Sequence, residues 1–183
     1  MLIFAATIAS ILAFQVYNHD RLDDPSYQWN EVLVFNDPNK QLLSTLNKFD
    51  YYQLHLYLEP VSEIHLNSTS CRAENIACMT PSRPGVVFLA TNFLELHLFE
   101  QMGTIAHEAA HFIYGHQHVR CTSPLIVNRN CDESMESAFG SELYLYKDLQ
   151  NILTDDDDSL NELSQLISST KVRINSLQKN TGQ

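Results

Sequence analysis

Residues 103–121 read GTIAHEAAHFIYGHQHVRC and contain four histidines and one glutamate. His107 and His111 lie four positions apart, so an α-helix places both imidazoles on one face, a turn apart. The neighbouring residues are mostly apolar or small, which favours a helix packed inside a domain. We therefore expect a buried helix on which two ring nitrogens can bind one metal ion.

Glu108 directly follows the first of these histidines and would project beside a bound ion. Zinc favours neutral imidazole, and a zinc ion with three protein ligands and a water molecule is the arrangement that performs catalysis. The residues HEAAH fit the HExxH pattern, in which the glutamate can take a proton from that water. The competing interpretation is a buried helix whose histidines only form hydrogen bonds. That interpretation gives little reason for three polar groups on an apolar helix, because buried polar groups cost free energy unless they have partners.

On this motif the sequence resembles the zincin metallopeptidases, whose active-site helix carries HExxH. The resemblance implies zinc-dependent hydrolysis of peptide bonds, by an endopeptidase rather than an exopeptidase. It makes His107 and His111 ligands of Zn2+, and Glu108 the general base that acts on the water molecule zinc activates. It also implies a strand beside the active-site helix that can pair with an extended peptide or protein substrate.

The sequence on both sides of the motif fits this family. Residues 84–94, PGVVFLATNFL, read as a turn, a β-branched and aromatic strand, and a second apolar stretch that leads into the helix. Gly115 stands where the helix is expected to end, since glycine adopts the left-handed C′ conformation at low cost. The expected fold class is therefore α+β: a small zincin-like domain with a few strands packed on the motif helix and a helical C-terminal half.

A catalytic zinc ion needs a third protein ligand, and the sequence offers several. Metzincins continue the motif as HExxHxxGxxH, and here the order is His111, Gly115 and His118. The interval from glycine to histidine matches, but the glycine comes one residue late, which turns the exit of the chain by about 100°. His118 is slightly favoured as the third ligand.

Gluzincins take the third ligand from a second helix, where some families read ExxADxxG. Residues 133–144, ESMESAFGSELY, place Glu133 seven positions before Gly140, but Glu136 and Ser137 replace the Ala-Asp pair. Glu133 or Glu136 is therefore the alternative third ligand.

His116 is a further candidate. The segment GHQHVRC followed by CD resembles an element of little-studied exported bacterial proteins that carry HExxH, and this would include the HxH pair in the site. His116 and His118 would share one side of an extended segment. Otherwise His116 is a solvent-facing turn residue. Tyr114, His116 and Tyr144 are candidates for stabilising the oxyanion that peptide hydrolysis generates.

The four cysteines favour export. Pairing Cys71 with Cys78 and Cys121 with Cys131 is the simplest of three connectivities. Disulfides persist in oxidising compartments, and the CxxC spacing of a structural zinc knuckle is absent from the sequence. The second disulfide would hold the segment that carries His118.

The N-terminus also favours export. Residues 1–17 contain an apolar run that resembles the core of a signal peptide, although no Lys or Arg precedes Arg21. A short uncleaved anchor or a buried N-terminal helix is the alternative. We expect an exported protein, which is periplasmic, secreted or at the cell surface, with one domain over residues 18–183.

Composition restricts the partners. The chain of 183 residues has 22 acidic and 11 basic residues, a formal net charge of −11. Such a charge argues against nucleic acid and against an anionic membrane surface, since the protein would repel phosphates. A peptide or protein substrate is the expected partner, with membrane contact only through an uncleaved N-terminal anchor.

Local patterns predict the other elements. His55 and His65 are expected to be surface residues rather than ligands, and the acidic run in residues 154–159 should cap the last helix. The remaining predictions are a helix over 39–50, extended segments over 51–60 and 61–70, a loop over 71–84, a helix over 132–153 and a last helix that reaches Leu177.

A non-catalytic interpretation competes with the enzyme. A secreted binding module could keep zinc for stability alone. Its site would be closed by four protein ligands, namely His107, His111, His118 and one acid, and would exclude water.

Overall fold

The computed structural model describes residues 40–66, 68, 70–72, 75–115, 118–122, 129–153 and 157–178. These residues belong to one compact unit, Val34–Gln183. The expected signal peptide or anchor at residues 1–17 lies outside the described residues, and so does His116. In the described part of the chain, no helix is both long and apolar enough to cross a membrane.

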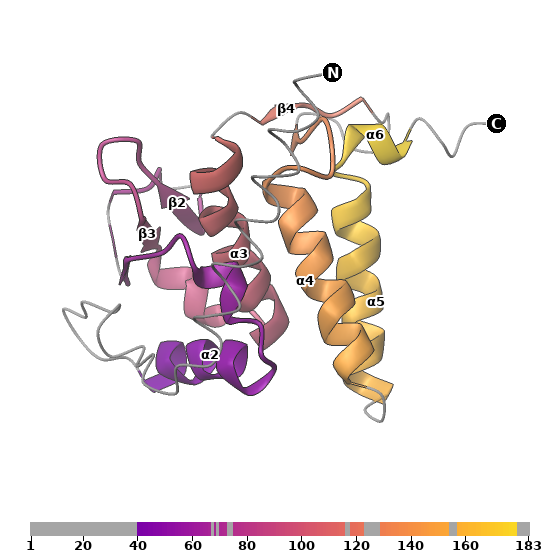
Figure 1. The fold of residues 1–183 in the computed structure, drawn as a ribbon, viewed down its shortest axis with the longest axis horizontal. Helices are drawn as coiled ribbons and strands as arrows, with labels where there is room; N and C mark the ends of the chain where they lie inside the picture. The colour runs from indigo at the N-terminus through magenta and orange to yellow at the C-terminus, as the bar shows by residue number, and fades with distance from the viewer. Residues whose placement is uncertain are drawn as a thin grey trace, which may run out of the picture. The chain divides into compact units, whose positions relative to one another are not determined.

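The fold is α+β, as expected, and α3 lies at its centre (Figure 1). Strands β2 and β3 pack on α3, and α4 packs on it from another side, followed by α5. The first half contains α2 (Lys40–Tyr51), η2 (His55–Leu58), β1 (Glu63–His65), β2 (Ala77–Met79), β3 (Val86–Leu89) and η3 (Thr91–Glu95). The second half contains α3 (Leu98–Tyr114), β4 (Val119–Arg120), β5 (Asn130–Cys131), α4 (Ala138–Ile152), α5 (Asp157–Lys171) and α6 (Asn175–Gln178).

The three-stranded sheet has the order β1-β3-β2. The central strand β3 pairs in parallel with β1 and antiparallel with β2. All four residues of β3 are buried, which agrees with its uninterrupted apolar sequence VVFL. The sequence therefore predicted this strand, the apolar stretch after it and the motif helix in the correct order.

The prediction of an extended segment over residues 51–60 is wrong. Leu54 and Leu58 are buried, whereas Leu56 between them is 49% exposed. Burial four residues apart is the spacing of a helical turn, and η2 forms there instead of a strand. Gln53 has a positive φ of 57°, which interrupts an extended chain directly before this turn. In the next predicted segment, Glu63–His65 form a strand, and the other described residues of that segment do not.

The helix predicted over residues 132–153 starts later than expected. The side chain of Ser137 accepts a hydrogen bond from the Gly140 N–H and caps α4, which begins at Ala138. Residues before Ser137 are therefore outside the helix. The last predicted helix is divided as well, because α5 ends at Lys171 and Ile174 forms an isolated parallel bridge with Asp132. Asp157 and Asp158 lie in the first turn of α5, where the helix dipole favours acids.

Helices α3 and α4 approach closely at a glycine. Gly103 of α3 faces Tyr146 of α4, whose side chain is almost fully buried. A β-carbon at position 103 would overlap the hydroxyl and ring carbons of this tyrosine. The absence of a side chain at Gly103 is therefore what lets α4 bring its tyrosine onto α3.

Replacing this glycine should destabilise the fold. We expect Gly103→Ala to lower the free energy of unfolding by about 1 to 3 kcal/mol, because overpacking forces the tyrosine or the backbone to move. Chemical denaturation of the metal-free protein measures the change. Thr104→Ala, at the next position of the same helix, adds no volume and serves as the control. Equal stability of the two variants would contradict the close contact.

Candidate metal centre

Three histidines come together at the C-terminal end of α3. His107 and His111 lie on α3, and His118 follows the helix on the chain that leads into β4. Each offers one ring nitrogen, and these three atoms all lie within 4.8 Å of one another. The ring centroids are 4.8 to 5.2 Å apart. The helix places the first two side chains on one face, and the turn at Gly115, where φ is 87°, returns the third to them.

Each of these imidazoles is oriented by a hydrogen bond at Nδ1. His107 Nδ1 lies 3.2 Å from a carboxylate oxygen of Glu142, and His118 Nδ1 lies 2.6 Å from one of Asp132. His111 Nδ1 lies 2.8 Å from the carbonyl oxygen of Gly115. Carbonyl and carboxylate oxygens accept hydrogen bonds, so Nδ1 is the donor in all three. In neutral imidazole the lone pair is then on Nε2, the nitrogen that can bind a metal ion.

The Nε2 atoms of His107 and His118 face each other at 3.4 Å. Two lone pairs this close repel unless a cation or a proton lies between them. The pKa of His107 lies above its ordinary value: burial lowers it, but the hydrogen bond and charge of Glu142, together with the charges of Glu108 and Asp132, outweigh burial. A metal ion that binds here must displace any proton held between these two nitrogens.

Asp132 connects His118 to the start of α4. One carboxylate oxygen accepts from His118, and the other accepts from the backbone N–H of Phe139 at 2.8 Å. Burial alone would raise the pKa of Asp132, but these hydrogen bonds outweigh burial and lower it. The residue is thus an ionised acceptor that fixes the ring of the histidine, as is common beside metal ligands.

Glu142 plays the equivalent part for His107. Its second carboxylate oxygen accepts from the Thr170 hydroxyl of α5 at 3.2 Å, and the hydroxyl of Tyr146 also donates to this carboxylate. The acid therefore joins α3, α4 and α5 through one buried hydrogen-bond network.

An aromatic residue closes one side of the cluster. The ring of Phe139 packs on His107 and His118, with centroids 4.4 and 5.2 Å apart. The guanidinium of Arg173 lies 4.0 Å from the centroid of the same Phe139 ring. This stack limits how far either imidazole can rotate.

Glu108 lies on α3 between the two helical histidines, toward the sheet. The backbone N–H of Met79, in β2, donates a hydrogen bond to its carboxylate. Burial raises the pKa of Glu108, and the nearby His107 and His118 oppose the shift only in part. A carboxylate with a raised pKa is a stronger base, which suits proton transfer near neutral pH.

The alternative third ligands lie apart from the cluster. Glu133 is exposed, and its carboxylate accepts from the side-chain amide of Asn175 at 3.4 Å. Glu136 is also exposed and lies near Tyr114. Neither belongs to the metal-capable group found among the described residues. Tyr114 and Tyr144, the candidates for the oxyanion, are each about half exposed.

Sequence reasoning missed the two acids that orient the histidines. The sequence does contain a sign of the role of Glu142, because this acid lies between the apolar residues Phe139, Leu143 and Tyr146, which are buried on α4. A carboxylate beside such an apolar stripe needs a partner. Asp132 follows the disulfide-bonded Cys131 directly, but its role depends on contacts that the local sequence does not encode.

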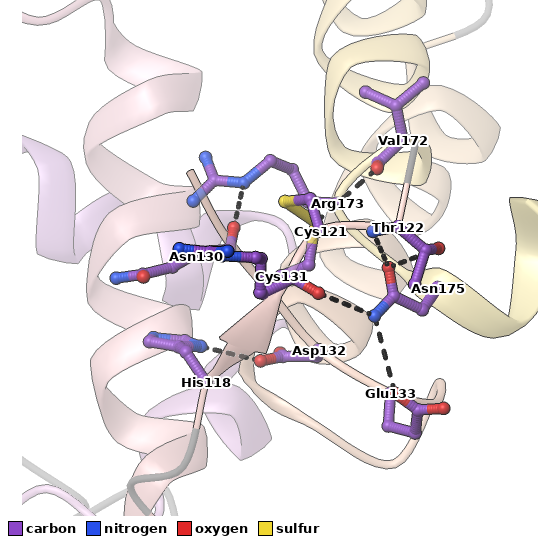
Figure 2. The surroundings of a disulfide bond; sticks show 11 residues. His118, Cys121, Thr122, Asn130, Cys131, Asp132, Glu133, Val172, Arg173 and Asn175 are labelled. Carbon is purple, nitrogen blue, oxygen red and sulfur yellow. Dashed lines mark hydrogen bonds and ion pairs between the residues drawn. A yellow bond between two sulfur atoms is a disulfide. The ribbon is translucent and has the colours of Figure 1, made fainter. Parts of the chain in front are cut away.

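Both predicted disulfides are present. Cys71 pairs with Cys78 and Cys121 with Cys131, with Cα–Cα distances of 5.5 and 4.9 Å. The second links Cys121, directly after β4, to Cys131 in β5; these are the two paired strands that follow His118 and precede Asp132 (Figure 2). Disulfides persist in oxidising compartments, so the two bonds indicate an oxidising environment.

In comparisons with known proteins, no family model matches the sequence, and no curated protein or solved structure matches it. The chemistry of the centre therefore follows from its own geometry. Three imidazoles with oriented rings fit a divalent transition metal ion, for which imidazole is a preferred ligand.

The cluster should bind one metal ion per chain. We expect the purified protein to carry about one zinc ion, and His118→Ala to weaken zinc binding by more than the 10- to 100-fold typical of an outer hydrogen-bond partner. Metal analysis and chelator competition measure this. His65→Ala is the control, because His65 lies in β1 and bonds to Glu63 instead. Full zinc occupancy after loss of both His107 and His118 would refute the site.

The two disulfides should differ in their effect on the metal. Closing loops with sequence separations of 7 and 10 residues should stabilise the chain by roughly 2 to 3 kcal/mol in each case. Only Cys121–Cys131 closes the hairpin that carries His118. We expect serine substitution of this pair to weaken zinc binding about tenfold or more, and the same change at Cys71 and Cys78 to leave it unaltered. Equal losses in the two double variants would contradict this difference.

Proposed function

We propose that the protein is an exported zinc metallopeptidase that hydrolyses peptide bonds within a peptide or protein substrate. One observation carries the proposal: three oriented imidazoles lie together beside a half-buried glutamate, and two of them share one helix with it in the HExxH order. The two disulfides support a location outside the cytoplasm.

The ligand set favours catalysis over a structural zinc site. The acids nearest the histidines, Asp132 and Glu142, bond to Nδ1 atoms and so orient the rings from outside. Among the described residues, the metal-capable group contains the three histidines alone. Three protein ligands that leave one position for water are typical of catalytic zinc, whereas structural sites are usually closed by four.

Glu108 is the proposed general base. When bound, zinc supplies Lewis acidity that polarises a carbonyl group and lowers the pKa of water. The glutamate accepts the proton of the attacking water and returns it to the leaving amine, and its raised pKa suits both transfers. The Met79 N–H donates to this carboxylate, which lowers the pKa of Glu108 and opposes part of the rise caused by burial.

The sheet offers a place for an extended substrate. Strand β2 is at the edge of the described sheet order and packs on α3. This is the relation between strand and active-site helix that the resemblance to zincins implies. A peptide that pairs with such an edge would pass close to Glu108, which bonds to the last residue of β2.

Glu108→Gln should separate catalysis from metal binding. The substitution keeps the size of the side chain but removes the proton acceptor, so the zinc content and thermal unfolding should remain close to those of the wild type. We expect hydrolysis of an unstructured protein substrate to fall by about 10² to 10⁴-fold. Glu136→Gln, an exposed acid near the same end of α3, is the matched control and should keep full activity.

Two outcomes would count against this assignment. If wild type and Glu108→Gln are equally active, another residue is the base. If the zinc-loaded wild type hydrolyses no member of broad peptide libraries, the protein is a binding module that keeps zinc for stability.

A further inference from the structure

Asn175, the first residue of α6, is almost fully buried beside the hairpin that carries the third histidine. It is 1% exposed and lies far from the HExxH motif in sequence. Figure 2 shows Asn175 beside Asp132, on the side away from His118. A buried carboxamide needs partners for both its oxygen and its nitrogen, so its contacts show what it holds together.

The Asn175 side chain bonds to both sides of the hairpin. Its oxygen accepts from the backbone N–H and the hydroxyl of Thr122, at 3.0 and 3.1 Å. Its nitrogen donates to the carbonyl of Arg120 at 3.2 Å and to the carboxylate of Glu133 at 3.4 Å. Arg120 and Thr122 lie two and four residues after His118, and Glu133 directly follows Asp132.

The backbone around Asn175 holds Asp132 directly. The Asn175 N–H donates to the carbonyl of Asp132 at 2.8 Å, and the Asp132 N–H donates to the carbonyl of Arg173 at 2.8 Å. Arg173 in turn donates from Nε to the carbonyl of Asn130 at 2.6 Å. The chain after α5 thus fixes Asp132, whose carboxylate orients His118 at 2.6 Å.

We propose that Asn175 is a positioning residue for a bound metal ion. Asn175 acts through Asp132 and the β4–β5 hairpin, which place the His118 ring. Within the described part of the chain, its side-chain hydrogen bonds go to the hairpin and to Glu133, and none goes to the three histidines or to Glu108, so its effect is expected to reach the metal through that hairpin. The inference rests on metal binding by the three histidines and not on peptide hydrolysis.

Zinc affinity of Asn175→Ala tests this role. Outer partners of a metal ligand typically contribute 10- to 100-fold to affinity, and we expect a loss in that range by chelator competition. Gln101→Ala is the matched control. Gln101 is also a buried carboxamide, 2% exposed, and bonds to Thr45 and to the carbonyl of Leu96, away from the histidines. Both variants should lower the stability of the metal-free protein, but only Asn175→Ala should weaken zinc binding.

A double-mutant cycle identifies the path of the effect. If Asn175 acts through His118, adding Asn175→Ala to the His118→Ala variant should change the zinc affinity by less than about twofold, which is within the usual error of additivity. Asn175→Asp provides a variant of the same volume in case the alanine variant does not fold. It keeps the acceptor for Thr122 but loses the donors to Arg120 and Glu133, and should also bind zinc more weakly than wild type.

The outcomes distinguish two failures. If wild type binds zinc and both Asn175 variants bind it equally well, Asn175 has only a structural role and the proposal is wrong. A full additional loss in the His118→Ala background would also overturn it, because the effect would then bypass His118. If wild type binds no zinc, the metal site itself is wrong and the positioning role falls with it.

Discussion

The hydrogen bond from each imidazole Nδ1 to an oxygen acceptor is the interaction on which the rest of the structure depends. The three acceptors come from the end of α3, from the residue after β5 and from the middle of α4. Two of them are carboxylates, Asp132 buried and Glu142 half-buried, and a carboxylate removed from water is costly without donors of its own. Phe139, Tyr146 and Thr170 supply these donors. Helices α4 and α5 therefore supply groups that orient the histidines of the cluster.

The packing of α3 on α4 connects to the same chemistry. The two helices run antiparallel, since Gly103 meets Tyr146 and His107 meets Glu142 in reverse order. The tyrosine can reach Glu142 because the glycine leaves room for its ring. The carboxylate then raises the pKa of His107, one turn along α3 from the glycine. A steric property of one helix position thereby admits a tyrosine that bonds to the same carboxylate as a candidate ligand.

Local sequence predicted the elements whose signals are themselves local. The HExxH helix, its end at Gly115, the strand before it and both disulfides follow from spacing, glycine geometry and short loops. The prediction of an extended segment over residues 51–60 was wrong because its alternating leucines also fit a helical turn. Which of the two structures forms depends on which leucines are buried. Asp132, Glu142 and Asn175 were missed because each acts across 14 or more residues of sequence. Their partners depend on tertiary packing, which no local pattern contains.

The contacts of Thr170, Arg173 and Asn175 determine how much of the chain a metal-binding fragment must include. All three candidate ligands and Glu108 precede α4, so a fragment cut after α4 would retain every residue that the motif identifies. Such a fragment would lose the hydroxyl that bonds to Glu142 and the backbone groups that bond to Asp132. The smallest unit that keeps this geometry extends through Asn175, well beyond the motif.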